Sequence, residues 1–338
     1  MSEALVKVSH GENLNFEESA EVMDSIMNGE CSPVCISSYL TALAMKGETV
    51  DEIAGSATEM RNHALKLPGE HGDALEIVGT GGDRSGSFNI STTSSFVVAS
   101  CGVPVAKHGN RAASSKCGAA DVLEALGARL DLEPSQSAEV LDRCGFCFMF
   151  AQKYHTSMKY VAPVRREIGI RTVFNILGPL TNPAFARNQL SGVFSEMMVR
   201  PMAEVLQRMG VRNALVVYGR DGLDEISVSD ETFCCELRDG RFSEYVITPE
   251  QFGLRRSGHD ELVGGGPEEN AGITRSVLSG DERGAKRDAV LINAGDGLYT
   301  CGRAGSIAEG IAMAAEAIDS GRAMACLDEY VRLTRSYP

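Results

Sequence analysis

The sequence has few prolines, no long apolar stretch and fewer basic than acidic residues. Its 338 residues include 11 Pro, 36 Gly, 32 Lys and Arg together, and 46 Asp and Glu together, and 43% of them are hydrophobic. This composition excludes a disordered chain, a collagen and a coiled coil. A formal net charge of −14 makes the chain a poor general ligand for nucleic acid or for an anionic membrane surface, so we expect neither as a partner.

No segment has the pattern of a membrane helix or of a secretion signal. The longest stretch without a charged residue, Ser85–Ala106, is rich in Ser, Thr and Gly, whereas a membrane helix needs about 20 mostly apolar residues. The start of the chain lacks the apolar core of a signal peptide. We therefore expect a cytoplasmic protein.

The ten cysteines form no disulfide framework, because they are scattered through a large chain. One Cys-x-x-Cys pair, Cys144 and Cys147, could serve redox or metal chemistry. No second pair and no histidine cluster completes a zinc site around it. We interpret the two residues as buried thiols at the start of a strand, with no function assigned.

The first seventy residues carry only helical patterns. Capping boxes at residues 15–18 and 49–52, and a Ser-Pro pair at 32–33, predict three amphipathic helices, the last of which ends near Lys66. Three helices with short connections make a small helical domain. The total length suits two domains or one large α/β domain.

After Gly72, short apolar runs alternate with helical stretches, which favours a doubly wound, mostly parallel sheet. Asp239-Gly240 lies between two further apolar runs and predicts a β-hairpin. From Asn270 onward we expect Ala-rich helices broken at Gly280, Gly295 and Gly321. The expected strands cover residues 75–78, 103–106, 146–150, 190–194 and 214–218, and the hairpin strands cover 233–237 and 242–247.

One segment of this acidic chain contains no acidic residue. Arg84–Ala120 has neither Asp nor Glu, where the composition of the chain predicts about five, yet it retains four cations. A chance gap over a buried strand and helix would explain the missing carboxylates but not the retained cations. We therefore interpret the segment as an anion site. The cations are Arg84, Lys107, Arg111 and Lys116.

A glycine loop stands at the start of this segment. Gly79–Asp83 follows an expected strand, and Ser87–Thr92 can cap the next helix, so backbone N–H groups and the helix N-terminus can approach an anion. The loop is no dinucleotide fingerprint, because Arg84 takes the third glycine position, and it is no Walker loop, because Ser87 replaces the lysine. An ordinary strand-to-helix turn is the plainer alternative. Three glycines, an Asp and a hydroxyl-rich helix start favour a phosphate cradle.

Lys107–Arg111 follows the next expected strand, so two successive strands bring a glycine loop and a cationic loop to one rim of the sheet. Lys107 supplies a point charge and Asn110 can orient a neutral polar group. Ser114 and Ser115 add hydroxyl groups. Taken alone, this cluster could equally be solvated surface charge.

Two adjacent carboxylates, Asp224 and Glu225, follow the expected strand at 214–218. A divalent cation would offset their repulsion, and Mg²⁺ completes its shell with water and substrate phosphates. Surface carboxylates are the plainer alternative. Arg165 stands at the end of an expected helix, where arginines commonly only complement the dipole, and His155 alone would more often be a core histidine.

Taken together and in order, these motifs resemble the anthranilate phosphoribosyltransferases over nearly the whole chain. Each motif alone is weak, but six in order are specific. The six are Gly-Thr-Gly-Gly-Asp at 79–83, Ser-Phe-Asn-Ile-Ser-Thr at 87–92, Lys-His-Gly-Asn-Arg at 107–111, Pro-Val-Arg-Arg at 163–166, Asn-Ile-Leu-Gly-Pro at 175–179 and Asp-Gly-Leu-Asp-Glu at 221–225.

The resemblance implies a fold and a reaction. The fold is α/β and like that of nucleoside phosphorylases, with a small helical domain at residues 1–71, joined by a helical segment around 165–185, and a phosphoribosyl pyrophosphate-binding α/β domain with a mostly parallel sheet at 72–338. The reaction is transfer of a phosphoribosyl group from phosphoribosyl pyrophosphate to the amino group of anthranilate in tryptophan biosynthesis. A homodimer and Mg²⁺, with two ions per subunit, are also implied.

The resemblance also implies roles for individual residues. Asp83, Lys107 and Arg165 would be catalytic; Gly79, Asn110 and Arg165 would hold anthranilate; Ser91, Asp224 and Glu225 would ligate Mg²⁺. The residues implied to contact phosphoribosyl pyrophosphate are Gly79, Gly82, Asp83, Ser87, Asn89, Ile90, Ser91, Thr92, Lys107, His108, Gly109, Asn110, Arg111, Ala112, Ala113, Ser114, Ser115 and Ala119.

Two departures from the family pattern stand out. Ser87 replaces a common threonine and keeps the hydroxyl, and Gln152 replaces a frequent proline in the segment before His155. Two alternative functions remain: a pyrimidine nucleoside phosphorylase of the same broad fold, and a catalytically silent relative that binds nucleic acid or a regulator. The cationic loop and the Asp224–Glu225 pair speak against the first, and the net charge speaks against the second.

Overall fold

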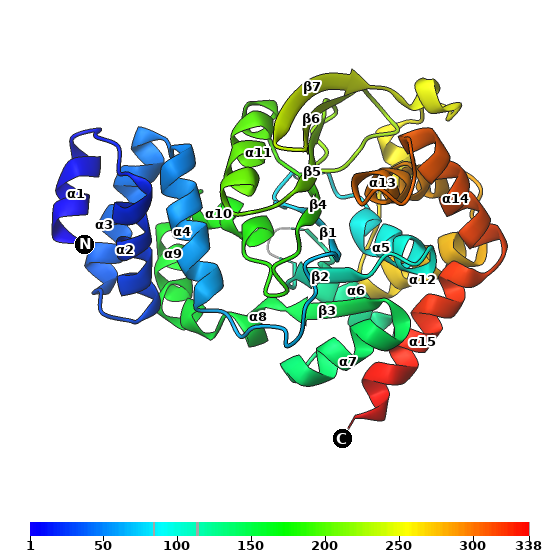
Figure 1. The fold of residues 1–338 in the computed structure, drawn as a ribbon, viewed down its shortest axis with the longest axis horizontal. Coiled ribbons are helices and arrows are strands. Elements are labelled where there is room, and N and C mark those ends of the chain that lie inside the picture. The colour runs from blue at the N-terminus through cyan, green and yellow to red at the C-terminus, as the bar shows by residue number, and fades with distance from the viewer. Residues whose placement is uncertain (84, 113–114, 338) are drawn as a thin grey trace.

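The computed structural model describes residues 1–83, 85–112 and 115–337. The chain begins with four helices that stand together at the left of Figure 1. Both predicted capping boxes are present, at Asn15 and at Thr49, and Ser32 caps the helix between them. The four helices are α1 (Ser2–Ser9), α2 (Phe16–Met27), α3 (Pro33–Lys46) and α4 (Val50–Asn62).

Two details of this region differ from the sequence prediction. Helix α1 was not predicted, and it has no side-chain cap that could mark its start. The end of α4 was predicted near Lys66 but lies at Asn62. Beyond α4, the Leu65 amide donates to the Tyr154 carbonyl and the Leu67 amide donates to that of Pro183. The helix therefore ends where distant backbone groups take over the hydrogen bonds.

The chain from residue 75 onward forms one seven-stranded sheet in the order β3-β2-β1-β4-β5-β6-β7. The first five strands are parallel and the last two antiparallel, which confirms the mostly parallel sheet. Asp239 and Gly240 both have positive φ, as a primed hairpin turn requires. The strands are β1 (Leu75–Gly79), β2 (Val105–Gly109), β3 (Phe146–Phe150), β4 (Asn188–Gly192), β5 (Asn213–Gly219), β6 (Thr232–Arg238) and β7 (Arg241–Ile247).

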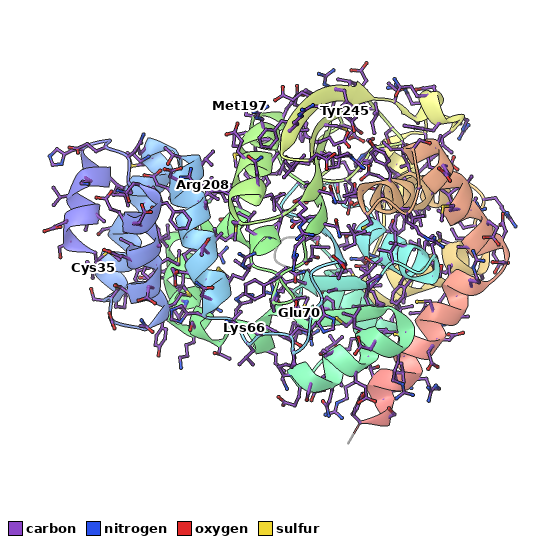
Figure 2. All side chains as sticks on the ribbon, in the orientation of Figure 1. Cys35, Lys66, Glu70, Met197, Arg208 and Tyr245 are labelled. Atoms are coloured by element: carbon purple, nitrogen blue, oxygen red, sulfur yellow. The ribbon has the colours of Figure 1, made fainter. Side chains whose placement is uncertain are left out.

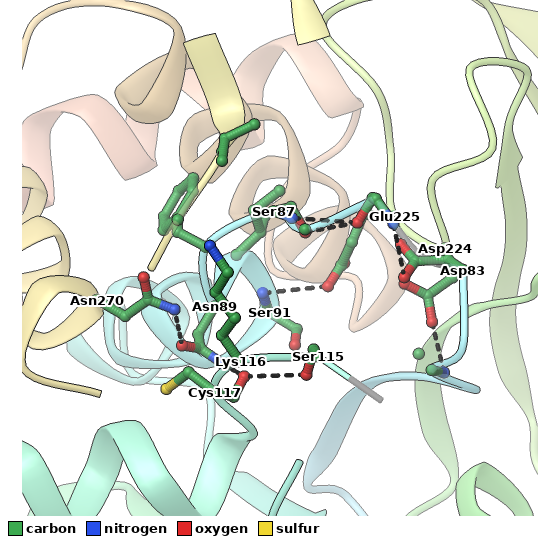
Figure 3. A pocket seen from close by; sticks show the side chains of 18 of the residues that line it. Asp83, Ser87, Asn89, Ser91, Ser115, Lys116, Cys117, Asp224, Glu225 and Asn270 are labelled. Carbon is green, nitrogen blue, oxygen red and sulfur yellow. Dashed lines mark hydrogen bonds between the residues drawn. The ribbon is translucent and has the colours of Figure 1, made fainter. Parts of the chain in front are cut away.

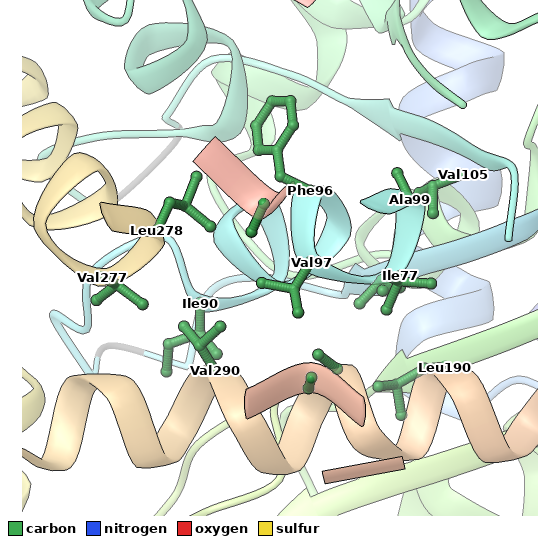
Figure 4. Packing of buried hydrophobic residues seen from close by; sticks show 14 of the residues in the cluster. Ile77, Ile90, Phe96, Val97, Ala99, Val105, Leu190, Val277, Leu278 and Val290 are labelled. Carbon is green, nitrogen blue, oxygen red and sulfur yellow. The ribbon is translucent and has the colours of Figure 1, made fainter. Parts of the chain in front are cut away.

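Helices cover both faces of the sheet, as a parallel sheet requires. Side chains alternate along β5: Leu215 and Val217 join the core with α5, α13 and α14, whereas Ala214 and Val216 join the core with α11. Figure 4 shows Phe96 and Val97 of α5 in the first core. The helices on this side are α5 (Ile90–Ser100), α6 (Ala119–Ala125), α7 (Pro134–Cys144), α12 (Pro267–Ser279), α13 (Ala285–Thr300), α14 (Ile307–Asp319) and α15 (Arg322–Ser336).

The opposite face of the sheet shares its core with the N-terminal helices. Helix α11 packs on α4, where Arg208 pairs with Asp51, and α9 packs on α3 (Figure 2). A division of the chain near residue 71, with a joining segment around 165–185, stays a prediction. The elements here are α8 (Ala151–Tyr154), α9 (Ala162–Ile168), α10 (Phe174–Leu177) and α11 (Val199–Arg208), with 3-10 turns at Thr156–Tyr160, Gly178–Leu180, Glu196–Met198, Pro249–Phe252 and His259–Leu262.

The predicted break at Gly295 is wrong, because α13 runs through it. A Cβ at Gly295 would lie 2.7 Å from the Ile311 backbone nitrogen, and a Cβ at Gly310 would lie 2.1 Å from the Gly295 carbonyl oxygen. The two glycines let α13 and α14 approach closely. Glycine here serves packing between helices and does not end a helix.

The described cysteines are all free, and Cys147 is buried in β3, as predicted. Cys144 is only partly buried, and its thiol donates to the Val140 and Phe146 carbonyls at the end of α7. No described helix is long and apolar enough to cross a membrane.

Candidate functional site

The site lies where the strand order reverses. Strand β1 has β2 on one side and β4 on the other, and ligands of open α/β sheets bind at the carboxyl ends of such a strand pair. Strands β1 and β4 each end in a glycine, Gly79 and Gly192. A Cβ at Gly79 would lie 2.3 Å from Asp224 Oδ2, and one at Gly192 would lie 1.6 Å from the Asp224 carbonyl oxygen. The two glycines therefore make room for the acidic loop after β5.

A cavity of about 390 Å³ opens at this edge (Figure 3). That volume is within the range of small-molecule sites. It gathers the glycine loop, the start of α5, the acidic pair and the loop before α12. The residues predicted from the sequence that line it are Gly79, Gly82, Asp83, Ser87, Asn89, Ile90, Ser91, Ser115, Asp224 and Glu225.

The glycine loop takes a conformation that other residues rarely adopt. Gly81 and Gly82 both have positive φ, and the Gly81 amide donates to Asp224 Oδ2 at 2.6 Å. Arg171 donates to the Gly82 carbonyl at 2.6 Å, so a cation that the sequence analysis did not select also holds the loop. The first turn of α5 follows and lines the same cavity, where its Ser91 amide donates to Glu225.

The acidic pair is buried, and few hydrogen-bond donors compensate its negative charge. Asp224 and Glu225 are each 8% exposed. Glu225 accepts from the Ser91 amide at 3.2 Å, and Asp224 accepts from the Gly81 amide. Burial raises the pKa of both carboxyl groups. The charge of Asp83 raises the pKa of Asp224 further, and the charge of Asp224 raises that of Glu225. Buried carboxylates with few donors fit a divalent cation, whose preferred ligands are such oxygens.

Lys107 lies behind the cavity wall and is not part of its lining. It is 2% exposed, and its ammonium donates to the Ile77 carbonyl and to Ser91 Oγ at 3.3 Å. Burial lowers its pKa, while Glu76, Glu225 and Asp224 oppose that effect. Its ammonium group therefore contacts Ser91, which lines the cavity, and contributes positive charge from behind that residue.

Other residues predicted to contact phosphoribosyl pyrophosphate also lie outside this lining. Arg111 turns toward α6, where it pairs with Asp121 at 2.9 Å and with Glu124 at 2.8 Å. The predicted residues Ala113 and Ser114 lie outside the described part of the chain. The roles predicted for the following residues outside the lining remain predictions: Thr92, Lys107, His108, Gly109, Asn110, Arg111, Ala112 and Ala119.

Two other predicted residues, His108 and Arg165, lie outside the lining of this cavity. The rings of His108 and His155 are 4.9 Å apart, and burial lowers the pKa of His108 to about 3 and that of His155 to about 4, so both are neutral near pH 7. Arg165 stands 5.4 Å from the ring of Phe174. Burial lowers its pKa, and no acidic partner among the described residues offsets that effect. An anionic ligand would supply the missing charge.

The sequence analysis missed several residues of the cavity. Asn270 donates to Asn89 Oδ1 at 2.9 Å and accepts from the Gly265 amide at 2.7 Å, so it ties the loop before α12 to the start of α5. Asn270 begins the stretch that was predicted to form Ala-rich helices, and no local pattern marks its role in the cavity. The other lining residues that no motif had singled out are Ser85, Gly86, Cys117, Val263, Gly264 and Gly265, whereas Gly81, Phe88 and Lys116 belong to segments already predicted to bind an anion.

A different acidic group lies among the N-terminal helices. The ligand atoms of Asp24, Glu59 and His63 come within 4.8 Å of one another. These side chains are partly exposed, and His63 already contacts Asp24 at 2.7 Å. The buried pair at the sheet edge needs no third protein carboxylate, because substrate and water oxygens complete a magnesium shell. We therefore keep the pair as the candidate metal site.

Comparison with known proteins identifies the family. Residues 71–324 match the model described as "Glycosyl transferase family, a/b domain", and residues 2–64 match that of its helical bundle domain. An anthranilate phosphoribosyltransferase of Methanobrevibacter smithii is 56% identical over 99% of this chain and 100% of its own. The chain belongs to the anthranilate phosphoribosyltransferase family.

Solved structures of this family agree with the fold described above. The Thermus thermophilus enzyme superimposes with a TM-score of 0.93 at 47% identity, covering 98% of this chain and 99% of its own. A Saccharomyces cerevisiae family member, solved in complex with PRPP and Mg, has a TM-score of 0.85 at 28% identity, covering 96% and 94%. Family membership confirms the predicted fold class and does not favour the phosphorylase or the silent relative.

Proposed function

We propose that the protein transfers the phosphoribosyl group of 5-phosphoribosyl 1-pyrophosphate to the amino group of anthranilate. The products are N-(5-phosphoribosyl)anthranilate and pyrophosphate, in tryptophan biosynthesis. The observation that carries the proposal is the cavity at the β1–β4 junction, which joins a glycine loop to a buried acidic pair in a chain of this family. The chemistry of each substrate matches one part of the site.

The donor is multiply anionic, so it needs amides and cations. The glycine loop 79–83 and the N-terminal end of α5, with its positive dipole, line the cavity together with Lys116. Lys107 adds positive charge from behind Ser91. We assign the pyrophosphate to this side of the cavity, where these groups stabilise the charge that develops as the anomeric C–O bond breaks.

Asp224 and Glu225, with Ser91, would hold Mg²⁺, as the buried and poorly balanced carboxylates require. A bound Mg²⁺ supplies positive charge to the oxygens of the leaving pyrophosphate. The Saccharomyces cerevisiae structure with PRPP and Mg supports this use. We keep two ions per subunit as the expected number.

The acceptor carries a carboxylate and a weakly basic amine. Arg165 has no acidic partner among the described residues and would bind the carboxylate, and Asn110 and Gly79 would orient the ring and the amine. A Saccharomyces cerevisiae relative in complex with 4-fluoroanthranilate supports such an acceptor. The amine nitrogen forms the new C–N bond to the anomeric carbon and then loses a proton to water. Positioning therefore contributes more than a strong base.

Three further features belong to the same proposal. The enzyme is a homodimer, it acts in the cytoplasm, and its helical and α/β parts close over the substrates during turnover. Size-exclusion chromatography with light scattering tests the first feature. A particle of 36.1 kDa, the mass of one chain, would contradict the homodimer.

The fluorescence of anthranilate tests the reaction itself. Purified protein, Mg²⁺, phosphoribosyl pyrophosphate and anthranilate are mixed, and the fluorescence loss is followed with each component omitted in turn. Loss that requires all of them, with one pyrophosphate released per anthranilate consumed, is the expected result. Donor binding by calorimetry without any loss would discard the acceptor. Phosphorolysis of uridine or thymidine by the same protein would favour the phosphorylase instead.

A further inference from the structure

Strands β1 and β2 separate close to the site. The two strands share one registered pair, Leu75 with Val105, whereas β1 with β4 and β2 with β3 are registered over five pairs each. Beyond Leu75, side chains fill the gap. On one face of the sheet, the Lys107 ammonium donates to the Ile77 carbonyl. On the other face, a buried carboxylate takes the corresponding place.

That carboxylate belongs to Glu76, which is 0% exposed. Both of its oxygens lie 3.1 Å from the His108 amide nitrogen and accept from it. Oε2 also accepts from the Asn182 side-chain amide. Asn182 in turn donates to the Ala106 carbonyl at 2.8 Å. Glu76 thus joins β1 to the end of β2 and to the segment that follows Gly178–Leu180.

The groups joined in this way carry predicted substrate residues. His108 stands between Lys107, whose charge lies behind the cavity, and Asn110, a predicted acceptor residue. His108 Nδ1 also contacts the Gly178 carbonyl at 3.3 Å. The end of β2 is therefore fixed from two sides, by Glu76 and by the segment 178–182. Neither Glu76 nor Asn182 lines the cavity.

Fold stability alone gives little reason for a carboxylate here. Burial raises the pKa of Glu76, and the charge of Lys107 only partly opposes that effect. A buried charged group is unfavourable unless hydrogen-bond donors or an opposite charge compensate it. Replacing buried charges by apolar side chains is often neutral or stabilising. Here the partners are two N–H donors and an ammonium at the place where the strands separate. The carboxylate satisfies both donors and balances Lys107 without touching a substrate.

We propose that Glu76, together with Asn182, is a positioning residue that holds Lys107, His108 and Asn110 in register with the glycine loop. The assignment rests on the phosphoribosyl transfer proposed above. Glutamine has the same shape, but it turns one acceptor into a donor, so either the His108 amide or the Asn182 amide loses its partner. The end of β2 then shifts relative to Gly79–Asp83.

The test compares Glu76→Gln with Asp296→Asn, a second replacement of a buried carboxyl by an amide, in α13 and away from the cavity. Both purified variants are checked by circular dichroism and thermal melting, and kcat and KM are measured for each substrate on folded protein. We expect Glu76→Gln to lower kcat/KM for both substrates about 10- to 100-fold. Asp296→Asn keeps the kinetic constants of the wild type.

A purely structural role would lower the melting temperature of Glu76→Gln and leave kcat and KM of the folded protein within about threefold of the wild type, which would overturn the assignment. Asn182→Asp is made alone and in the Glu76→Gln background, where the aspartate accepts from the new amide although it no longer donates to the Ala106 carbonyl. We expect it to restore part of the lost kcat/KM, so the two changes are not additive. Additive losses would overturn the proposed pairing.

Glu76→Asp covers the case in which Glu76→Gln does not fold. It keeps the charge but withdraws the oxygens by one methylene, so it should also lose activity, and wild-type kinetics would overturn the assignment. A wild-type protein without transferase activity would instead overturn the proposed function, and this assignment with it. An active wild type with unchanged Glu76 variants overturns this assignment alone.

Discussion

Two regions of the molecule bury carboxyl groups, and they differ in what surrounds them. At the carboxyl edge of the sheet, Asp224 and Glu225 face a cavity, whereas Glu76, the second residue of β1, lies outside its lining and accepts from two donors. Between α13 and the β6–β7 hairpin, Asp296 is 0% exposed. Its Oδ1 has no partner among the described residues, and its Oδ2 accepts only from Thr300 Oγ1 at 3.4 Å. Burial and the charge of Glu236 raise the pKa of Asp296 to about 8.

Glu236 itself is well supplied with donors. It accepts from Tyr299 at 2.9 Å, from Tyr245 at 3.2 Å and from Arg238 at 2.7 Å (Figure 2 labels Tyr245). Asp296 lies beside this cluster without sharing its donors. A buried carboxyl group can be compensated in two ways, by hydrogen-bond donors of the protein or by a bound ligand. At the sheet edge a ligand can reach the carboxyl groups, whereas no cavity described above reaches Asp296.

Replacing Asp224 and Glu225 together by Ala tests the ligand side of this comparison, and we expect the largest effect here. Loss of the oxygens that hold the cation should lower kcat/KM by about 1,000-fold or more and remove its dependence on Mg²⁺. Stability should change little, because removing two unfavourable buried charges is offset by the acceptors lost to the Gly81 and Ser91 amides and by the lost charge balance at Lys107. Magnesium titrations of activity and urea denaturation measure both effects. Full Mg²⁺-dependent turnover in the double variant would refute the metal assignment.

Alanine at a glycine in each region should separate activity from stability. Gly192→Ala places a Cβ 1.6 Å from the Asp224 carbonyl oxygen, so it should displace the acidic loop and lower kcat/KM about 100-fold. Gly295→Ala places a Cβ 2.7 Å from the Ile311 nitrogen, so it should lower the free energy of unfolding by about 3 kcal/mol through overpacking. The folded fraction of Gly295→Ala should keep wild-type kinetics. Equal activity losses in both variants would contradict the separation.

Asp296→Asn tests the protein side of the comparison. An amide keeps the shape and cannot ionise, so the free energy of unfolding near pH 6 should rise by about 2 kcal/mol. Urea denaturation of wild type and variant under the same conditions measures the change. A destabilised variant would mean that the carboxylate has a donor that matters to the fold.

The same variant gives a pH dependence of about half that size per pH unit. The pKa of Asp296 is about 8 in the folded chain and 3.8 for the free side chain, so between these values the unfolded chain binds fewer protons. Relative to Asp296→Asn, the wild type is therefore most stable below pH 4. Its relative free energy of unfolding falls by about 1 kcal/mol per pH unit as the pH rises toward 8. Urea midpoints at pH 5, 6, 7 and 8 check the slope, and a constant difference would refute it.

Much of the fold and part of the site could be predicted from the sequence, because their signals lie in neighbouring residues. The two capping boxes, the Asp-Gly turn and the alternating apolar runs specify backbone conformation over a few residues each. The glycine loop and the Asp224–Glu225 pair were visible for the same reason. Since parallel strands end at one edge, the alternation of strands and helices predicted that the glycine loop and the cationic loop reach one rim of the sheet.

Only the tertiary structure decided where several side chains point. Lys107 and Arg111 stand in one motif, yet Lys107 is buried against Ile77 and Ser91, whereas Arg111 leaves the cavity for Asp121 and Glu124. Asn270 reaches Asn89 across a separation of 181 residues. Such contacts depend on which surfaces the folded chain brings together, and no local pattern encodes them.

The sequence by itself thus determined most of the elements, their order along the chain and the chemical groups carried to the edge of the sheet. The folded chain decided which of those groups face the cavity and which stand behind it. It also decided that Gly295 packs one helix on another and that Glu76 fills the gap between β1 and β2. The physical reason is the separation along the sequence over which each interaction acts. Hydrogen bonds within a turn of the chain specify its local conformation, whereas burial and charge balance depend on neighbours that are distant in sequence.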